Sequence, residues 1–152
     1  MDEIPARHHL AKFYKNILSQ LEDYLYLPQI NPSYYQIAAI VLSIGFLYTG
    51  GLWSKVILLT FILLLDWFDG ATARKYQKTN YEGLLIDMTA DRLSEAFIFI
   101  KEIISPLGRI FFFLFLLNLV LSFVSLKLNK IFILPLRFIF LIILWLEIYG
   151  LF

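Results

Sequence analysis

Two pairs of aspartates stand out in a chain that is otherwise mostly apolar. Asp66 and Asp69 come at the end of a long apolar run, and Asp87 and Asp91 follow after a short polar link. A charged side chain at the bilayer centre costs about 2.5–3.5 kcal/mol, so aspartates close to hydrocarbon indicate function. Carboxylate oxygens without sulfur or paired histidine favour Mg²⁺, or the related Mn²⁺. Two such ions could hold both oxygens of a displacement at phosphorus.

The spacing of these residues predicts that they converge when the segments are helical. At about 100° per residue, one sector of the first helix holds Asp66, Asp69, Gly70, Ala73 and Arg74. On the next helix Asp87 and Asp91 lie one turn apart, with Gly83 one turn before them. The link between the helices is short, so we expect antiparallel neighbours whose four carboxylates gather near the cytoplasmic surface. Small residues give a ligand room, and the arginine can bind phosphate, so the pattern predicts a site for metal-bound diphosphate.

Composition decides where these helices lie. Of 152 residues, 60% are hydrophobic and 16% charged, against about 45–50% and about 25% in soluble domains. We therefore expect one membrane domain, residues 1–152. The absence of cysteine excludes disulfides and zinc–thiolate sites, and a net charge of +1 argues against nucleic-acid binding.

The predicted fold is all-α, a polytopic bundle of transmembrane helices behind an interfacial amphipathic helix at residues 5–27. Its alternative is an ordinary surface helix. Five transmembrane helices are expected at about 33–49, 52–74, 82–104, 107–126 and 131–152. Hydropathy alone does not clearly predict a transmembrane helix at 82–104, because acidic residues interrupt its apolar residues.

Basic residues predict the orientation of the chain if 82–104 crosses the membrane. One side then carries eight, namely Arg7, Lys12, Lys15, Arg74, Lys75, Lys78, Lys127 and Lys130. The other side carries three, namely Lys55, Lys101 and Arg109. The N-terminus is therefore expected in the cytoplasm and the C-terminus outside.

The aspartate stretch also carries a family resemblance. Residues 66–91 read Asp-x2-Asp-Gly-x2-Ala-Arg-x8-Gly-x3-Asp-x3-Asp, which resembles the signature of the CDP-alcohol phosphatidyltransferases at all eight specified positions. The resemblance implies that Asp66, Asp69, Asp87 and Asp91 hold two divalent ions, Mg²⁺ or Mn²⁺, and that Asp91 is also the general base. It implies a CDP-binding set of Asp66, Asp69, Gly70, Ala73, Arg74 and Gly83.

The resemblance further implies an integral-membrane transferase of phospholipid biosynthesis. It would transfer a phosphatidyl-type group from a CDP-linked lipid to a small polar alcohol or alcohol phosphate, releasing CMP. The expected protein is a homodimer in the cytoplasmic membrane, with its site facing the cytoplasm. Members typically have six spans after the interfacial helix, against five counted here, which bears on the acceptor pocket more than on the metal site.

Acceptor binding is predicted for Arg137, with Lys127 and Lys130 nearby, because an arginine inside an apolar run suits an anionic acceptor. The alternative for Arg137 is anchoring at the membrane surface. Glu95 is expected either to support the metal site or to pair with Arg92.

Three alternatives to this function stay open. A CDP-choline or CDP-ethanolamine type of transferase would use a lipid as acceptor. A protein of another class would bind CDP-lipid without catalysis or carry divalent cations. The aspartates could also be structural, paired with Arg74, Arg92 and the lysines.

Overall fold

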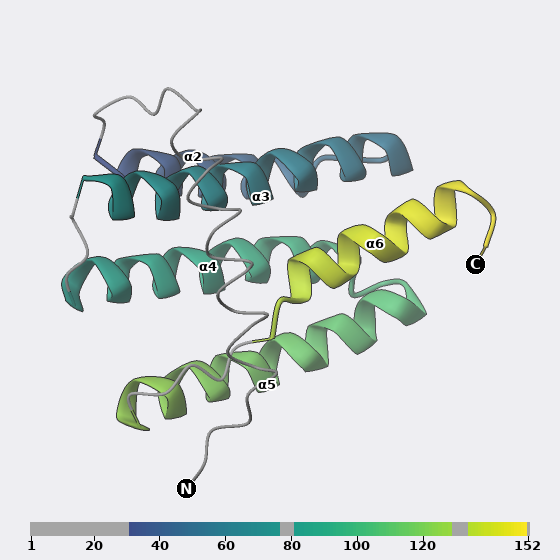
Figure 1. Ribbon diagram of the computed structural model, residues 1–152. Coiled ribbons are helices and arrows are strands. Elements are labelled where there is room, and N and C mark those ends of the chain that lie inside the picture. The colour runs from purple at the N-terminus through teal and green to yellow at the C-terminus, as the bar shows by residue number, and fades with distance from the viewer. Residues whose placement is uncertain (1–30, 77–80, 129–133, 152) are drawn as a thin grey trace, which may run out of the picture.

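The computed structural model describes residues 31–76, 81–128 and 134–151, apart from the side chains of Arg74, Tyr81, Glu82 and Leu84. These ranges form five helices and no strand: α2 (Ser33–Phe46), α3 (Leu52–Lys75), α4 (Tyr81–Glu102), α5 (Pro106–Leu128) and α6 (Leu136–Ile148). Successive helices run in alternating directions (Figure 1). The predicted all-α class is confirmed, whereas the helix expected at 5–27 lies outside the described residues.

Local sequence signals set several helix ends. The hydroxyl of Ser105 accepts a hydrogen bond from the Gly108 N–H at 2.9 Å, and Pro106 takes the first helical position of α5. Both are common at a helix start, where backbone N–H groups lack partners. Gly150 follows α6 with a φ of 68°, and it ends the helix in a Schellman motif, which favours glycine there.

The helices fall into two length classes. The helices α3, α4 and α5 have 24, 22 and 23 residues, and about 1.5 Å per residue makes each longer than a hydrocarbon core of about 30 Å. Among the described residues, two segments are both long and apolar enough to cross a membrane, Leu52–Ala73 and Pro106–Leu128. The helix α4 is long enough, but its charged residues, such as Asp87 and Asp91, make it less apolar than these two segments.

The other two helices are shorter than the spans expected from the sequence. The helix α2 has 14 residues where 33–49 was expected, and α6 has 13 where 131–152 was expected. Each is therefore only about 20 Å long. Figure 1 shows α6 beginning beside the middle of α5 rather than at its end, so its first turn lies inside the bundle.

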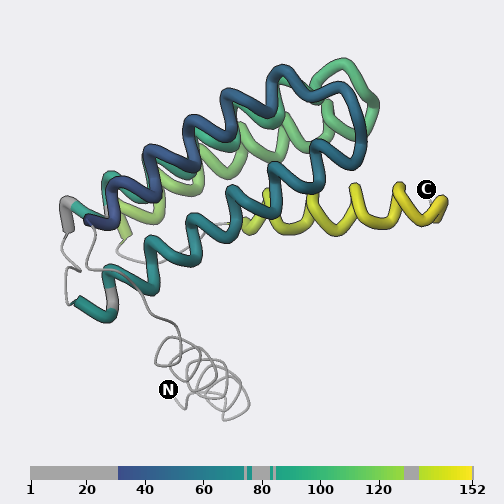
Figure 2. Tube along the Cα trace, turned by 90° about the horizontal axis from the view of Figure 1, so that it is seen from above, coloured from purple at the N-terminus to yellow at the C-terminus, as the bar shows by residue number. Residues whose placement is uncertain are grey.

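The packing of the bundle differs from the simple pair expected for the two aspartate helices. The helix α2 packs against both α3 and α4, while α6 packs against α3 and α5. Figure 2 shows α2 and α3 side by side over much of their length. The helices α3 and α4 are antiparallel, as expected, but the expectation that they pack directly on each other is wrong for the described residues, because α2 packs between them and contacts both.

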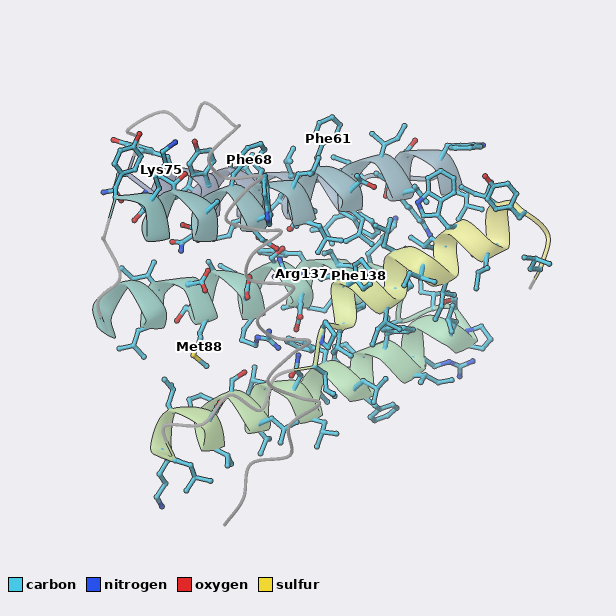
Figure 3. All side chains as sticks on the ribbon, in the orientation of Figure 1. Phe61, Phe68, Lys75, Met88, Arg137 and Phe138 are labelled. Carbon is cyan, nitrogen blue, oxygen red and sulfur yellow. The ribbon has the colours of Figure 1, made fainter. Side chains whose placement is uncertain are left out.

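Phenylalanines from α4, α5 and α6 pack together in the apolar core of the bundle. The ring of Phe99 on α4 lies 5.5 Å from that of Phe111 on α5 and 5.6 Å from that of Phe140 on α6, centroid to centroid. Such aromatic pairs add about 0.5–1.5 kcal/mol each beyond their buried area. Other large apolar side chains point outward, including Phe61 (Figure 3). An apolar outer surface is what a helical bundle presents to lipid.

Candidate active site

The aspartates of α3 and α4 come together, as the sequence predicts. Asp69 of α3 and Asp87 of α4 contact the same side-chain amide. A glutamine of α2 joins them, because Gln36 Nε2 donates to Asp69 Oδ2 at 2.7 Å and lies 3.4 Å from Asp87 Oδ1. Asp69 and Gln36 are both buried. Three helices therefore build this half of the site.

The other two aspartates meet at an arginine of α6. Arg137 Nη1 lies 2.8 Å from Asp66 Oδ2, and its Nη2 pairs with Asp91 Oδ1. Its guanidinium thus bridges α3 and α4. Figure 3 shows Arg137 at the start of α6, in the interior of the bundle. Since only 7% of this residue is exposed, its cation contacts the acidic cluster and does not anchor the chain at the membrane surface.

Two further polar side chains of α4, Ser94 and Glu95, lie close to Arg137. Ser94 of α4 accepts a hydrogen bond from Arg137 Nη1 at 3.4 Å and forms another with Ser43 of α2. Glu95 pairs with Arg92, which is one of the two roles expected for it. Its Oε2 pairs with Arg92 Nη1 at 2.7 Å, and its Oε1 lies 4.0 Å from Arg137 Nε. Ser94 and Glu95 therefore hold the guanidinium of Arg137 in addition to the two aspartates.

The donor set fits a hard divalent cation chemically. Four carboxylates and an amide converge, and Gln36 Oε1 is buried without a hydrogen-bond partner, which makes it a suitable oxygen ligand for Mg²⁺. Within the described ranges, however, no three acidic or histidine side chains are arranged to hold an ion. The Arg137 guanidinium lies between Asp66 and Asp91, so a metal ion there would meet a like charge.

The predicted CDP-binding residues lie near the same end of the bundle. Gly70 and Ala73 are partly buried in the last two turns of α3, and Gly83 lies in the first turn of α4. The side chain of Arg74 is outside the described part, as is Lys130. Lys127 is exposed in the last turn of α5, which separates it from the buried Arg137.

Two contributors to the site, Gln36 and Ser43, were not predicted from the sequence. Both are polar residues inside the otherwise apolar helix α2, and both are buried. A polar side chain in a membrane segment usually faces the bundle interior and finds a partner there. That rule could have flagged Gln36, although not its aspartate partners on other helices.

Comparison with known proteins agrees with this geometry. The family model for CDP-alcohol phosphatidyltransferase matches residues 32–147, which is more than half of the chain and includes every helix that contributes to the site. Searches of curated proteins and of solved structures give no match. With the signature aspartates gathered in one site and the match running from α2 to α6, the chain belongs to the CDP-alcohol phosphatidyltransferase family, a family of transferases.

Proposed function

We propose that this protein transfers a phosphatidyl-type group from a CDP-linked lipid to a small polar alcohol or alcohol phosphate, and releases CMP. The observation that carries the proposal is the convergence of Asp66, Asp69, Asp87 and Asp91, at the family's spacing, from two helices onto one site. The membrane setting suits both the lipid donor and the lipid product. The family match supports CDP-alcohol chemistry as the reaction class.

The proposed reaction is a displacement at the phosphorus next to the lipid. The acceptor oxygen forms a bond to that phosphorus while the bond to the CMP oxygen breaks, and the acceptor proton passes to Asp91. A carboxylate suits this task because proton removal by a positioned base typically contributes about 10²–10⁴-fold to a rate. Asp91 pairs with Arg137 of α6, which supports an acceptor bound on the side of Arg137.

Two Mg²⁺ or Mn²⁺ ions would be held by the four aspartates and, when bound, would neutralise the diphosphate of the donor. Gln36 would keep Asp69 and Asp87 in place for them. The donor would lie along Gly70, Ala73 and Gly83, where small residues leave the backbone open to close approach. Arg74 would bind its phosphates, since a guanidinium matches phosphate oxygens in a fork.

Arg137 would bind the anionic part of the acceptor. Its guanidinium is already directed at Asp91, the proposed base. An acceptor phosphate would compete with Asp66 and Asp91 for this cation and thereby release the carboxylates. The exposed Lys127, and with it Lys130, would draw anionic acceptors toward the site rather than contact them.

The proposed setting is the cytoplasmic membrane, with the site facing the cytoplasm. The excess of basic residues on one side supports this orientation. We also propose a homodimer, as is usual in the family.

The decisive experiment measures CMP release by purified protein in detergent with Mg²⁺ or Mn²⁺, a CDP-lipid and a panel of polar alcohols and alcohol phosphates. Release that depends on one acceptor is the expected result. Competition by CDP-choline against CDP-lipid separates the reversed reaction, in which a lipid is the acceptor. If no acceptor yields CMP although metal and CDP-lipid both bind, the transferase proposal is wrong, and metal flux into vesicles then tests transport.

A further inference from the structure

One asparagine in the middle of α5 bonds to the chain just before α6. Asn118 has no exposed surface. Its Nδ2 donates to the Leu134 carbonyl at 3.0 Å, and its Oδ1 accepts from the Leu134 N–H at 2.9 Å. The side chain thus satisfies both backbone polar groups of one residue, as a neighbouring β-strand would.

The position of Leu134 explains why such a partner is needed. Leu134 lies outside any helix, and Pro135 after it has no N–H to donate. Inside a membrane bundle, irregular backbone is tolerated only where its polar groups find partners within the protein. Halfway along α5, Asn118 supplies a partner for the Leu134 N–H and a second donor to its carbonyl, which also accepts from the Leu136 N–H, so α6 begins at that depth.

The depth of the α6 start in turn sets the position of the arginine. Arg137 lies in the first turn of α6, three residues after Leu134. The same Asn118 amide lies 3.4 Å from Glu95 Oε2, and Glu95 Oε1 lies 4.0 Å from Arg137 Nε. Asn118 therefore contacts both the backbone just before α6 and the side chain of Glu95, which lies close to Arg137.

We propose that Asn118 is a positioning residue: it fixes the start of α6 at the depth at which Arg137 bridges Asp66 and Asp91. This inference deepens the proposed function, on which it rests for the role of the acidic cluster as a metal and substrate site. It predicts that Asn118 affects that cluster only through Arg137.

A double-mutant cycle in the full chain tests this dependence. Mn²⁺ affinity, measured by electron paramagnetic resonance in detergent, is compared for the wild type, Asn118→Ala, Arg137→Gln and the double variant. Removing a like charge a few ångströms from the ion should tighten Mn²⁺ binding in Arg137→Gln by about tenfold or more. Asn118→Ala should tighten it in the same direction, because Arg137 is no longer held between the aspartates.

The double variant should bind Mn²⁺ like Arg137→Gln alone, since Asn118 and Arg137 are linked through Glu95 and residues of one polar network give non-additive effects. Ser122→Ala is the matched control, because this buried hydroxyl of α5 bonds only to the Asn118 carbonyl of its own helix among the described contacts. It should leave Mn²⁺ affinity unchanged. A general loss of structure would weaken Mn²⁺ binding, so tighter binding together with slower CMP release separates positioning from damage.

Additive effects of the two substitutions, or weaker Mn²⁺ binding in Asn118→Ala, would overturn the inference. If the wild type binds no Mn²⁺, the melting temperatures of the same four proteins are compared without metal. Additive shifts in melting temperature would also overturn the inference. If the effects of Asn118→Ala and Arg137→Gln are non-additive but no CMP is released, only the proposed function is contradicted. CMP release without coupling contradicts only the role of Asn118.

Discussion

The charges inside the bundle are only partly balanced by one another. Arg92 and Glu95 form one pair, and Arg137 is shared between Asp66 and Asp91. Among the described contacts, the carboxylates of Asp69 and Asp87 have no cationic partner and contact only the neutral amide of Gln36. Because uncompensated carboxylates are costly in a membrane protein, this surplus of negative charge favours cation binding at Asp69 and Asp87.

Asp91→Asn should reduce CMP release by at least about 100-fold, because the amide cannot take the acceptor proton. Binding of CDP-lipid should be largely kept, since the other three aspartates remain. Kinetics and CDP binding by calorimetry measure the two effects separately. Glu147→Gln is a suitable control, because this acidic residue is exposed near the far end of α6. Activity retained in Asp91→Asn would show that another group is the base.

Gln36→Leu should weaken Mn²⁺ binding by about 10–100-fold, the usual effect of losing a residue that orients metal ligands. The substitution removes the amide that holds Asp69 and Asp87 together. Leu42→Ala on the same helix is the control, because the Leu42 side chain packs against the apolar core. Equal losses in both variants would mean that α2 supports the fold rather than the site.

At the scale of whole helices, the sequence predicted some elements better than others. The signature aspartates could be placed because their spacing fixes one face of each helix, whatever packs beside it. The start of α6 was expected too early, although Pro135 in the apolar run after Lys130 favours a helix start at that point, and the sequence gives no signal for the depth of that start in the bundle. That depth depends on Asn118, which is distant in sequence and interrupts an apolar run without any recognisable motif.

The same limit applies to α2 and to Arg137. A lone glutamine or arginine in an apolar segment signals a buried partner, but only the packing of α2 and α6 shows that the partners are the signature aspartates. Sequence therefore predicted the acidic half of the site. The side chains that compensate its charge required the structure.

The turn between α4 and α5 allows a test of helix packing. A Cβ added to Gly108 would lie 1.8 Å from the Glu102 carbonyl oxygen, whereas one added to Gly45 in α2 meets nothing within 4 Å. Gly108→Ala should lower the free energy of unfolding by about 1–3 kcal/mol, as overpacking usually does. Gly45→Ala should raise it by up to about 1 kcal/mol through helix propensity. Thermal melting in detergent compares the two, and equal behaviour would contradict the close approach at Gly108.

At the scale of the whole molecule, polar and apolar groups are separated in a way that suits a bilayer. The acidic cluster and its arginine lie inside the bundle, while large apolar side chains such as Phe113 and Phe123 of α5 are exposed on its outside. A soluble protein seldom exposes apolar patches of this extent. A bundle of this kind keeps its charged groups away from lipid while its apolar outer surface faces the bilayer.

The proposed orientation of the site can be tested at the two ends of α3. This helix has 24 residues, about 36 Å, and the exposed residues Gly50 and Lys75 lie at its opposite ends. The chain has no cysteine, so single substitutions to cysteine can be labelled selectively with a membrane-impermeant maleimide. Gly50→Cys should react in intact cells, and Lys75→Cys only after permeabilisation, because basic residues favour the cytoplasmic side. The reverse pattern would place the site outside the cell, away from cytoplasmic CDP-alcohols, and labelling of both in intact cells would show that α3 does not span the membrane.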